Sequence, residues 1–116
     1  FYGSCFKALR EDGIMVNQHE SPFYAADAAA CQRAHKLIVE SFHISRVYQA
    51  HIPTYPSGHW LFGFASKKYH PLRDLKETQW NMRGLKCRYY TTTLHKGAFY
   101  LPAYVEDLLK DVEQKY

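Results

Sequence analysis

Helical and strand-like patterns of hydrophobic positions alternate along the first part of the chain. From Phe1 to Leu9 the apolar residues recur three and four positions apart, which predicts an amphipathic helix over residues 1–12. Gly13 follows, where a glycine in the left-handed conformation often ends a helix. The continuous apolar run at residues 14–16 is typical of a strand buried on both faces, as in a parallel sheet. The polar residues after it would lie at its carboxyl end, where open α/β sheets bind ligands.

A second helix is predicted from Ser21 to Phe42. Ser21 and Pro22 form a typical helix start, with serine as the cap and proline in the first position. The alanine-rich segment that follows has one apolar face and one polar face. The apolar face consists of Cys31, Ala34, Leu37, Ile38 and Phe42.

Two strands follow this helix and are predicted to pair. Residues 43–52 alternate in part, and residues 60–65 are apolar. The six-residue loop Pro-Thr-Tyr-Pro-Ser-Gly, residues 53–58, connects them, so we expect an antiparallel hairpin. Farther on, the pattern predicts a helix within residues 67–85, a strand or extended segment in CRYYTTTLH, and a final amphipathic helix in LPAYVEDLLKDVEQKY.

This order of elements predicts an α/β fold that is half of a doubly wound sheet with flanking helices. The 116 residues suit one domain, and no repeat or linker divides them. A half-sheet leaves a strand edge uncovered, and the chain begins without methionine inside a helical pattern. We therefore expect residues 1–116 to be part of a longer domain.

Composition and motif spacing exclude several functions. The formal net charge is +4, but the basic residues are scattered, unlike a nucleic-acid surface. No apolar run is long enough to span a membrane. The three cysteines, without a C-x-x-C pair, favour a reducing cytoplasm. No metalloprotease, nucleophile-elbow or dinucleotide motif occurs, and His51 and His59, which flank the loop, have no evident third metal ligand.

Three polar side chains are candidates for a binding site. Gln18 and Glu20 follow the first strand, and Tyr55 stands between two prolines in the hairpin loop. If these segments share one edge of the sheet, they offer an amide oxygen, a carboxylate and an aromatic face, all of which can receive an ammonium group. The alternative is that Tyr55 packs locally and that the other two side chains are solvated.

The same residues carry a family resemblance. The segment IPTYPSG at 52–58, preceded by LREDGIMVNQHESPF, resembles the polyamine aminopropyltransferases of the spermidine synthase family. The tail adds the family's YY…H…AF.LP pattern, here Tyr89, Tyr90, His95, Ala98, Phe99, Leu101 and Pro102. The similarity covers almost the whole chain and corresponds to the C-terminal half of the catalytic domain.

The resemblance implies a Rossmann-like, methyltransferase-type fold and transfer of an aminopropyl group from decarboxylated S-adenosylmethionine to putrescine, which gives spermidine. It assigns Gln18 and Tyr55 to the diamine site, with Glu20, Pro56 and Trp60 beside it. It places the general-base aspartate, the cofactor loop and a small β domain upstream. The segment would therefore carry no catalytic residue, bind no cofactor alone and be inactive alone, and we expect a cytoplasmic homo-oligomer, a dimer or tetramer, for the enzyme.

Two other interpretations stay open. A non-catalytic fragment could associate through the bare strand edge at residues 14–16. Alternatively, the chain could belong to a related methyltransferase that uses intact S-adenosylmethionine. The sequence also leaves open which amine is the acceptor.

Overall fold

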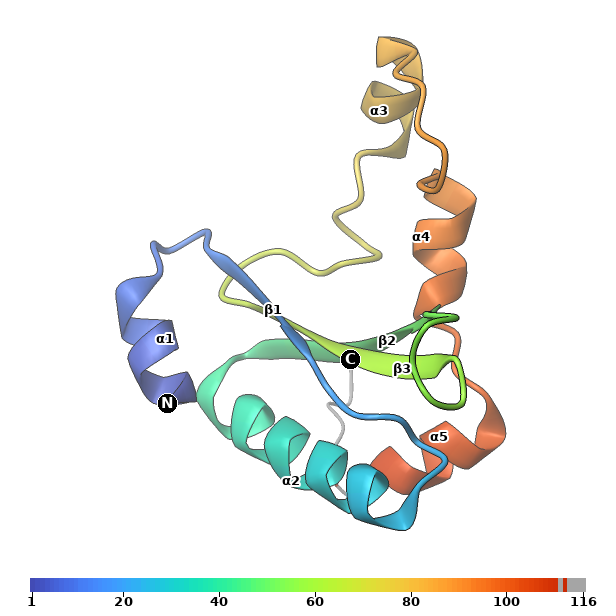
Figure 1. Cartoon of the computed structure of the whole chain (residues 1–116). Helices are drawn as coiled ribbons and strands as arrows, with labels where there is room; N and C mark the ends of the chain where they lie inside the picture. Colours follow the sequence, from blue (N-terminus) through green and yellow to red (C-terminus); the bar gives the residue numbers. More distant parts are fainter. Residues whose placement is uncertain (111, 113–116) are drawn as a thin grey trace.

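A computed structural model describes residues 1–110 and 112, and within them it has five helices and three strands (Figure 1). In chain order the elements are α1 (Tyr2–Ala8), β1 (Ile14–Gln18), α2 (Ala25–Ser41), β2 (Ile44–His51), β3 (His59–Ser66), α3 (Glu77–Arg83), α4 (Thr92–Ala98) and α5 (Ala103–Leu109). Among the described residues, no helix combines the length and the apolar character that crossing a bilayer requires.

The three strands form one sheet in the order β1-β3-β2, and both pairings are antiparallel. The predicted hairpin of β2 and β3 is confirmed, with His51 opposite His59 next to the loop. Because β1 and β2 both run antiparallel to β3, they point the same way, and their carboxyl ends meet at one edge of the sheet (Figure 1).

One face of the sheet packs on helices α1, α2 and α5 (Figure 1). The buried residues beneath it form two clusters. One consists of Cys31, Val47, Leu61, Val105, Leu109 and Val112, and the other of Ile38, Phe42 and Ala65 with Tyr2, Phe6, Leu9 and Met15 packed against it. Strand residues on the opposite face, which α4 covers in part, are half-buried or exposed, except for the buried pair Ile44 and Ser66 at one end.

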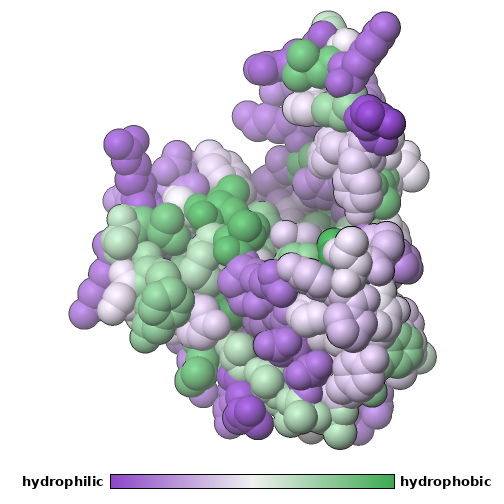
Figure 2. Space-filling view, in the orientation of Figure 1, coloured by the Kyte–Doolittle hydropathy of each residue, from purple (hydrophilic) through white to green (hydrophobic). Residues whose placement is uncertain are grey.

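The prediction that residues 14–16 are buried on both faces is wrong. β1 alternates between exposed and half-buried residues, with Ile14 47% and Val16 60% exposed. It lies at the edge of the sheet, and its only partner strand among the described residues is β3. Hydrophobic surface is therefore visible over β1 and α1 on the left of Figure 2.

The long helix α2 begins later than predicted. Ser21 and Pro22 precede it in a bent segment, and the residue before its first turn is Tyr24, whose side chain makes no cap bond. The buried stripe also differs, because His35 is fully buried whereas Leu37 is 53% exposed. The stripe that faces the sheet is Cys31, His35, Ile38 and Phe42, with a spacing of four, three and four residues.

Gly13 does not end the first helix in a left-handed conformation. Helix α1 ends at Ala8, with Leu9 extended, and Gly13 has no positive φ. A Cβ at Gly13 would lie 2.7 Å from the Cβ of Leu9 and 3.0 Å from the carbonyl oxygen of Arg10. The glycine is needed for this close approach of the chain to itself.

The prediction of an extended segment in CRYYTTTLH is wrong for its second half. Thr91 caps helix α4, and its hydroxyl accepts a hydrogen bond of 2.9 Å from the amide of Leu94. A threonine cap stabilises a helix start by about 1 kcal/mol, which outweighs the strand preference of neighbouring threonines. Helix α5 confirms the start of the predicted last helix, while residues 111 and 113–116 lie outside the described part.

Two glycines should respond oppositely to alanine. A Cβ at Gly63 would collide with the amide oxygen of Asn17 and lie 2.8 Å from Nε2 of His19. We expect Gly63→Ala to lower the free energy of unfolding by about 1–3 kcal/mol. Gly97 in α4 has no neighbour within 4 Å of such a Cβ, so Gly97→Ala should raise it by up to about 1 kcal/mol. Urea unfolding measures both, and equal effects of the two substitutions would contradict the close approach at Gly63.

Candidate functional site

The proline-flanked loop between β2 and β3 is a closed turn. Its ends are joined by a hydrogen bond of 2.9 Å from the Ile52 amide to the Gly58 carbonyl. Within it, the Tyr55 amide donates to Ile52 at 3.0 Å, and the Gly58 amide donates to Tyr55 at 3.1 Å. Ser57 and Gly58 both adopt positive φ, 67° and 70°. These bonds give Tyr55 a defined position at the sheet edge.

Three of the predicted site residues form one aromatic corner. The rings of Tyr55 and Trp60 meet edge to face, with centroids 4.9 Å apart. The indole Nε1 of Trp60 donates a hydrogen bond of 3.3 Å to the carbonyl of Pro56. Tyr55 is nevertheless 42% exposed. The corner therefore holds an accessible aromatic ring against a second ring, a surface suited to a cation or a hydrocarbon chain.

Gln18 lies on the same face of the sheet as this corner. It is the last residue of β1 and pairs in register with Phe62 of β3. Trp60 is two residues away from Phe62 along β3, so Gln18 and Trp60 are diagonal neighbours, which in a sheet lie roughly 7–8 Å apart. Gln18 is exposed. Its amide is therefore available to a ligand that touches the aromatic corner.

Glu20 stands in a segment that is fixed to the same edge. The amide of His19 donates to the carbonyl of Leu61 at 2.9 Å, which extends the strand pairing past Gln18. One residue beyond Glu20, the hydroxyl of Ser21 meets that of Ser57 at 2.9 Å. All five predicted site residues thus lie at the one edge where β1 and β2 end (Figure 1).

His59 organises this edge from the helix-covered side, and the sequence indicated a surface or hydrogen-bonded histidine here rather than a metal ligand. Its Nε2 bonds Oε1 of Gln49 at 2.8 Å, and its Nδ1 bonds the Tyr104 hydroxyl at 2.8 Å. Since an amide oxygen only accepts, Nε2 carries the proton and Nδ1 accepts from Tyr104. Burial and the neighbouring His51 lower the pKa of His59. The ring is therefore a neutral structural link between β2, β3 and α5.

A metal site at His51 and His59 is not formed by the described residues. Their rings stack with centroids 6.0 Å apart. Within residues 1–110 and 112 no three histidine, cysteine or acidic side chains gather closely enough to hold a metal ion. Cys31, the most buried cysteine, has a pKa raised to about 11 by burial, so its thiol is protonated and unreactive at neutral pH.

A buried polar cluster lies beneath the end of β1. The amide of Asn17 approaches Nδ1 of His19 at 3.3 Å, and the rings of His19 and His35 meet edge to face at 5.6 Å. Burial lowers the pKa of His19 to about 4, and burial together with His19 lowers that of His35 to about 3. Both rings are therefore neutral at physiological pH, and the cluster includes His19, the buried residue between Gln18 and Glu20 that directly follows β1.

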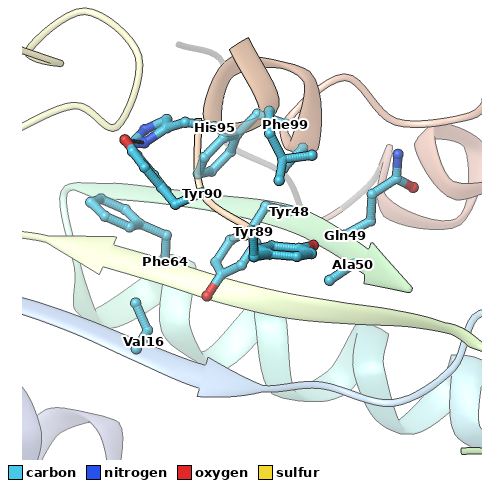
Figure 3. A pocket seen from close by; sticks show the side chains of 11 residues that line it. Val16, Tyr48, Gln49, Ala50, Phe64, Tyr89, Tyr90, His95 and Phe99 are labelled. Atoms are coloured by element: carbon cyan, nitrogen blue, oxygen red, sulfur yellow. Dashed lines mark hydrogen bonds between the residues drawn. The ribbon is translucent and has the colours of Figure 1, made fainter. Parts of the chain in front are cut away.

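An apolar cavity of about 260 Å³ opens beside the site on the face that α4 covers. Residues of the tail pattern line it together with Val16, Tyr48 and Phe64 from the sheet (Figure 3). The Tyr90 hydroxyl bonds Nδ1 of His95 at 2.8 Å, while Nε2 of His95 bonds the carbonyl of Pro71 at 2.8 Å. Because that carbonyl only accepts, Nε2 of His95 carries the proton, and Tyr90 donates. The tail pattern thus builds one wall of this cavity.

A family model described as the spermine/spermidine synthase domain matches residues 1–77. Among curated relatives, a polyamine aminopropyltransferase of Agathobacter rectalis is 66% identical over 115 residues, which is 99% of this chain and 40% of the relative. One of Clostridium beijerinckii is 67% identical over 109 residues, 94% of this chain and 38% of the relative. The chain thus spans about 40% of the length of these relatives.

Solved structures show the same similarity. Spermidine synthase from Thermotoga maritima superposes with a TM-score of 0.86 at 35% identity, over 94% of this chain and 38% of that one. A spermidine synthase in complex with the transition state analogue AdoDATO superposes with a TM-score of 0.86 at 35% identity, over 94% of this chain and 36% of that one. The three-stranded sheet with its helices is therefore a part of a methyltransferase-like α/β fold, as predicted.

The two buried histidines should make the fold sensitive to acid. Their pKa values in the fold, about 4 and about 3, lie below the 6.5 of an unfolded histidine. The unfolded chain therefore takes up protons that the fold excludes, and stability present above pH 6.5 is lost as the pH falls towards 3. Between pH 6 and 5 we expect each histidine to contribute up to about 1.4 kcal/mol per pH unit to this loss, measured by urea unfolding.

The control for this slope is His51, which is exposed. His35→Gln should make the loss between pH 6 and 5 shallower, and His51→Gln should change it less, because it acts only through the pKa of His59, which His51 lowers. Equal slopes for the native chain and His35→Gln would show that His35 is not the buried neutral group that the fold requires.

Proposed function

Since the chain belongs to the spermine/spermidine synthase family, we propose that it supplies the amine-binding part of a polyamine aminopropyltransferase. The whole enzyme would transfer an aminopropyl group from decarboxylated S-adenosylmethionine to putrescine, yielding spermidine and methylthioadenosine. The observation that carries the proposal is the meeting of Gln18, Glu20 and the Tyr55–Trp60 corner at one edge of the sheet. The two segments that carry the family resemblance, LREDGIMVNQHESPF and IPTYPSG, meet at this edge.

The donor set suits a linear diamine. Putrescine carries an ammonium group at each end of a four-carbon chain. The Gln18 amide oxygen and the Glu20 carboxylate accept hydrogen bonds from an ammonium group, and the carboxylate also neutralises its charge. The exposed ring of Tyr55, backed by Trp60, can lie against the methylene chain or the cation. A site of this kind binds one end of the diamine and directs the other towards the second substrate.

The reaction needs a free amine at the reacting end. An ammonium group must lose a proton before its nitrogen attacks the carbon next to the sulfonium sulfur, and the sulfur leaves as a neutral thioether. In this proposal the base that takes the proton, an aspartate, and most of the sulfonium site belong to the remaining part of the enzyme. The residues of this chain hold the unreactive end of the diamine, so the reacting nitrogen lies at a fixed reach from that site.

The exposure of β1 agrees with a site that is shared between this chain and the rest of the enzyme. Ile14 and Val16 are exposed at the outer strand, although an apolar edge strand is normally covered. We place the rest of the catalytic domain against the outer side of β1, which makes residues 1–116 a partial domain. The three free cysteines agree with a reducing cytoplasm, and we expect the complete enzyme to be a homo-oligomer, a dimer or tetramer.

Replacing the loop tyrosine tests the proposal in the full-length enzyme that contains this segment. We expect Tyr55→Ala to lower kcat/KM for putrescine 10- to 100-fold, because the amine loses its aromatic wall, while the KM for decarboxylated S-adenosylmethionine stays within twofold. Tyr55→Phe, which keeps the ring, should lose less than tenfold. Steady-state assays with each substrate varied give these constants.

The matched control is Tyr100→Ala, because the Tyr100 side chain is 69% exposed and the hydrogen bond from Gln49 goes to its backbone carbonyl, which the substitution keeps. It should leave both constants unchanged. Assays with intact S-adenosylmethionine as the donor separate the proposed enzyme from a methyltransferase. Unchanged putrescine kinetics in Tyr55→Ala, or turnover with the intact donor alone, would contradict the proposal.

A further inference from the structure

The candidate amine site has two walls, the segment with Gln18 and Glu20 and the aromatic corner of Tyr55 and Trp60. A hydrogen bond between two serine hydroxyls joins the two walls. Ser21 follows Glu20, and Ser57 follows Tyr55 and Pro56 in the loop, and their Oγ atoms lie 2.9 Å apart. The two residues are 36 positions apart in the sequence. This contact links the segment that carries Gln18 and Glu20 directly to the loop that carries the aromatic corner.

The backbone conformation of Ser57 indicates that its hydroxyl is important for the loop. Ser57 is the one residue other than glycine with positive φ among those described, at 67°. A residue other than glycine is strained in this region, and glycine would avoid the strain. The hydroxyl supplies an offsetting gain, since it also bonds the amide and carbonyl of His59 at 3.3 Å each. The loop therefore adopts a strained conformation that presents this hydroxyl to Ser21.

Ser21 is held rigidly on its own side. It is fully buried, and its Oγ also accepts a hydrogen bond of 3.3 Å from the Phe23 amide. The Phe23 ring then packs against His59 and Tyr104, with centroids 5.7 and 5.5 Å away. His59 is itself fixed by Gln49 and Tyr104, as described above. The serine contact thus ends in a network that reaches β2, β3 and α5, and it is not a contact between two mobile loops.

We infer that Ser21 and Ser57 are positioning residues that set the gap between the two walls of the amine site, and we call their contact the serine clasp. This inference rests on the proposed function, since the gap matters only if an amine binds in it. Neither serine needs to touch the substrate. Without the clasp the loop would keep its own backbone bonds but lose its alignment with Gln18 and Glu20. The amine would then bind weakly, while the sulfonium substrate would be unaffected.

The test uses the full-length enzyme with four variants: Ser21→Ala, Ser57→Ala, Ser57→Gly and the double Ser21→Ala/Ser57→Ala. Ser57→Gly removes the hydroxyl but relieves the strain at positive φ, so it separates the clasp from the backbone conformation and remains informative if Ser57→Ala folds poorly. Two quantities are measured in each variant: the KM for each substrate with kcat, and deuterium exchange of the amides in residues 52–58.

The expected result is specific to the amine. Each single variant, Ser57→Gly included, should raise the KM for putrescine about 5- to 20-fold, with less than a threefold change in kcat and an unchanged KM for decarboxylated S-adenosylmethionine. The double variant should be no worse than a single one, because both substitutions remove the same bond. Ser21→Ala should speed exchange in residues 52–58 while leaving exchange in β1 and β3 unchanged.

Four outcomes would overturn the inference. Multiplied effects in the double variant, or native kinetics in Ser57→Gly, would show that the hydroxyls do not act as a pair. Native exchange in residues 52–58 of Ser21→Ala would show that the clasp does not hold the loop. Faster exchange with unchanged putrescine KM would remove the positioning role. In that last case Tyr55→Ala shows whether the proposed function fails as well. If the proposed function is right, Tyr55→Ala still weakens putrescine turnover, and only the role of the serines is wrong. If Tyr55→Ala leaves putrescine turnover unchanged, the amine site itself is misplaced.

Discussion

The position of β3 between β1 and β2 is the constraint on which the rest of the structure depends. Backbone hydrogen bonds on both sides of β3 fix two registers at once, with Gln18 opposite Phe62 in one and His51 opposite His59 in the other. A slip of one residue in either pairing would move every side chain of that strand to the other face. These registers bring the end of β1 and the start of the hairpin loop to a single edge. The candidate site is a consequence of this edge, with residues from one segment on each side of β3.

Side chains on the helix-covered face of the sheet hold the site residues on its open face in position. Beneath the edge, the neutral rings of His19 and His35 lie against Asn17, and Gly63 leaves room for them because a Cβ there would collide with this cluster. Beside it, His59 links β2 to α5 through Gln49 and Tyr104. The hydrogen bonds of His59 favour one arrangement of the chain over its alternatives, whereas Oδ1 of Asn17, Nε2 of His19 and both ring nitrogens of His35 are buried without a partner among the described residues and cost stability. The amide and rings on the open face are therefore held in place by the strand registers, the loop hydrogen bonds and His59.

Sequence patterns predicted the parts of the fold that follow from local spacing. The hairpin and helix α2 follow from element order and from a six-residue connection, and the structure has both. A common edge for Gln18, Glu20 and Tyr55 was a condition of the predicted site, and the structure meets it. The patterns failed where the burial of a residue depends on which other parts of the molecule cover its helix or strand. The apolar run of β1 could not reveal that its open face is exposed, and a polar residue such as His35 gave no sign that it belongs to the buried stripe. Ser21 looked like a helix cap because its partner, Ser57, is far away in the sequence, and Thr91 outweighed the strand preference of its neighbours through one cap bond.

The central claim is that an amine lies between Gln18 and Glu20 on one side and Tyr55 and Trp60 on the other. The most direct test is a crystal structure of the full-length enzyme with putrescine bound. The account predicts one nitrogen of the diamine within hydrogen-bonding distance of the Gln18 amide oxygen or the Glu20 carboxylate, with its methylene chain against the Tyr55 ring. A diamine bound elsewhere, such as in the apolar cavity under Tyr89 and Phe99, or a Tyr55 ring turned away from it, would contradict the account.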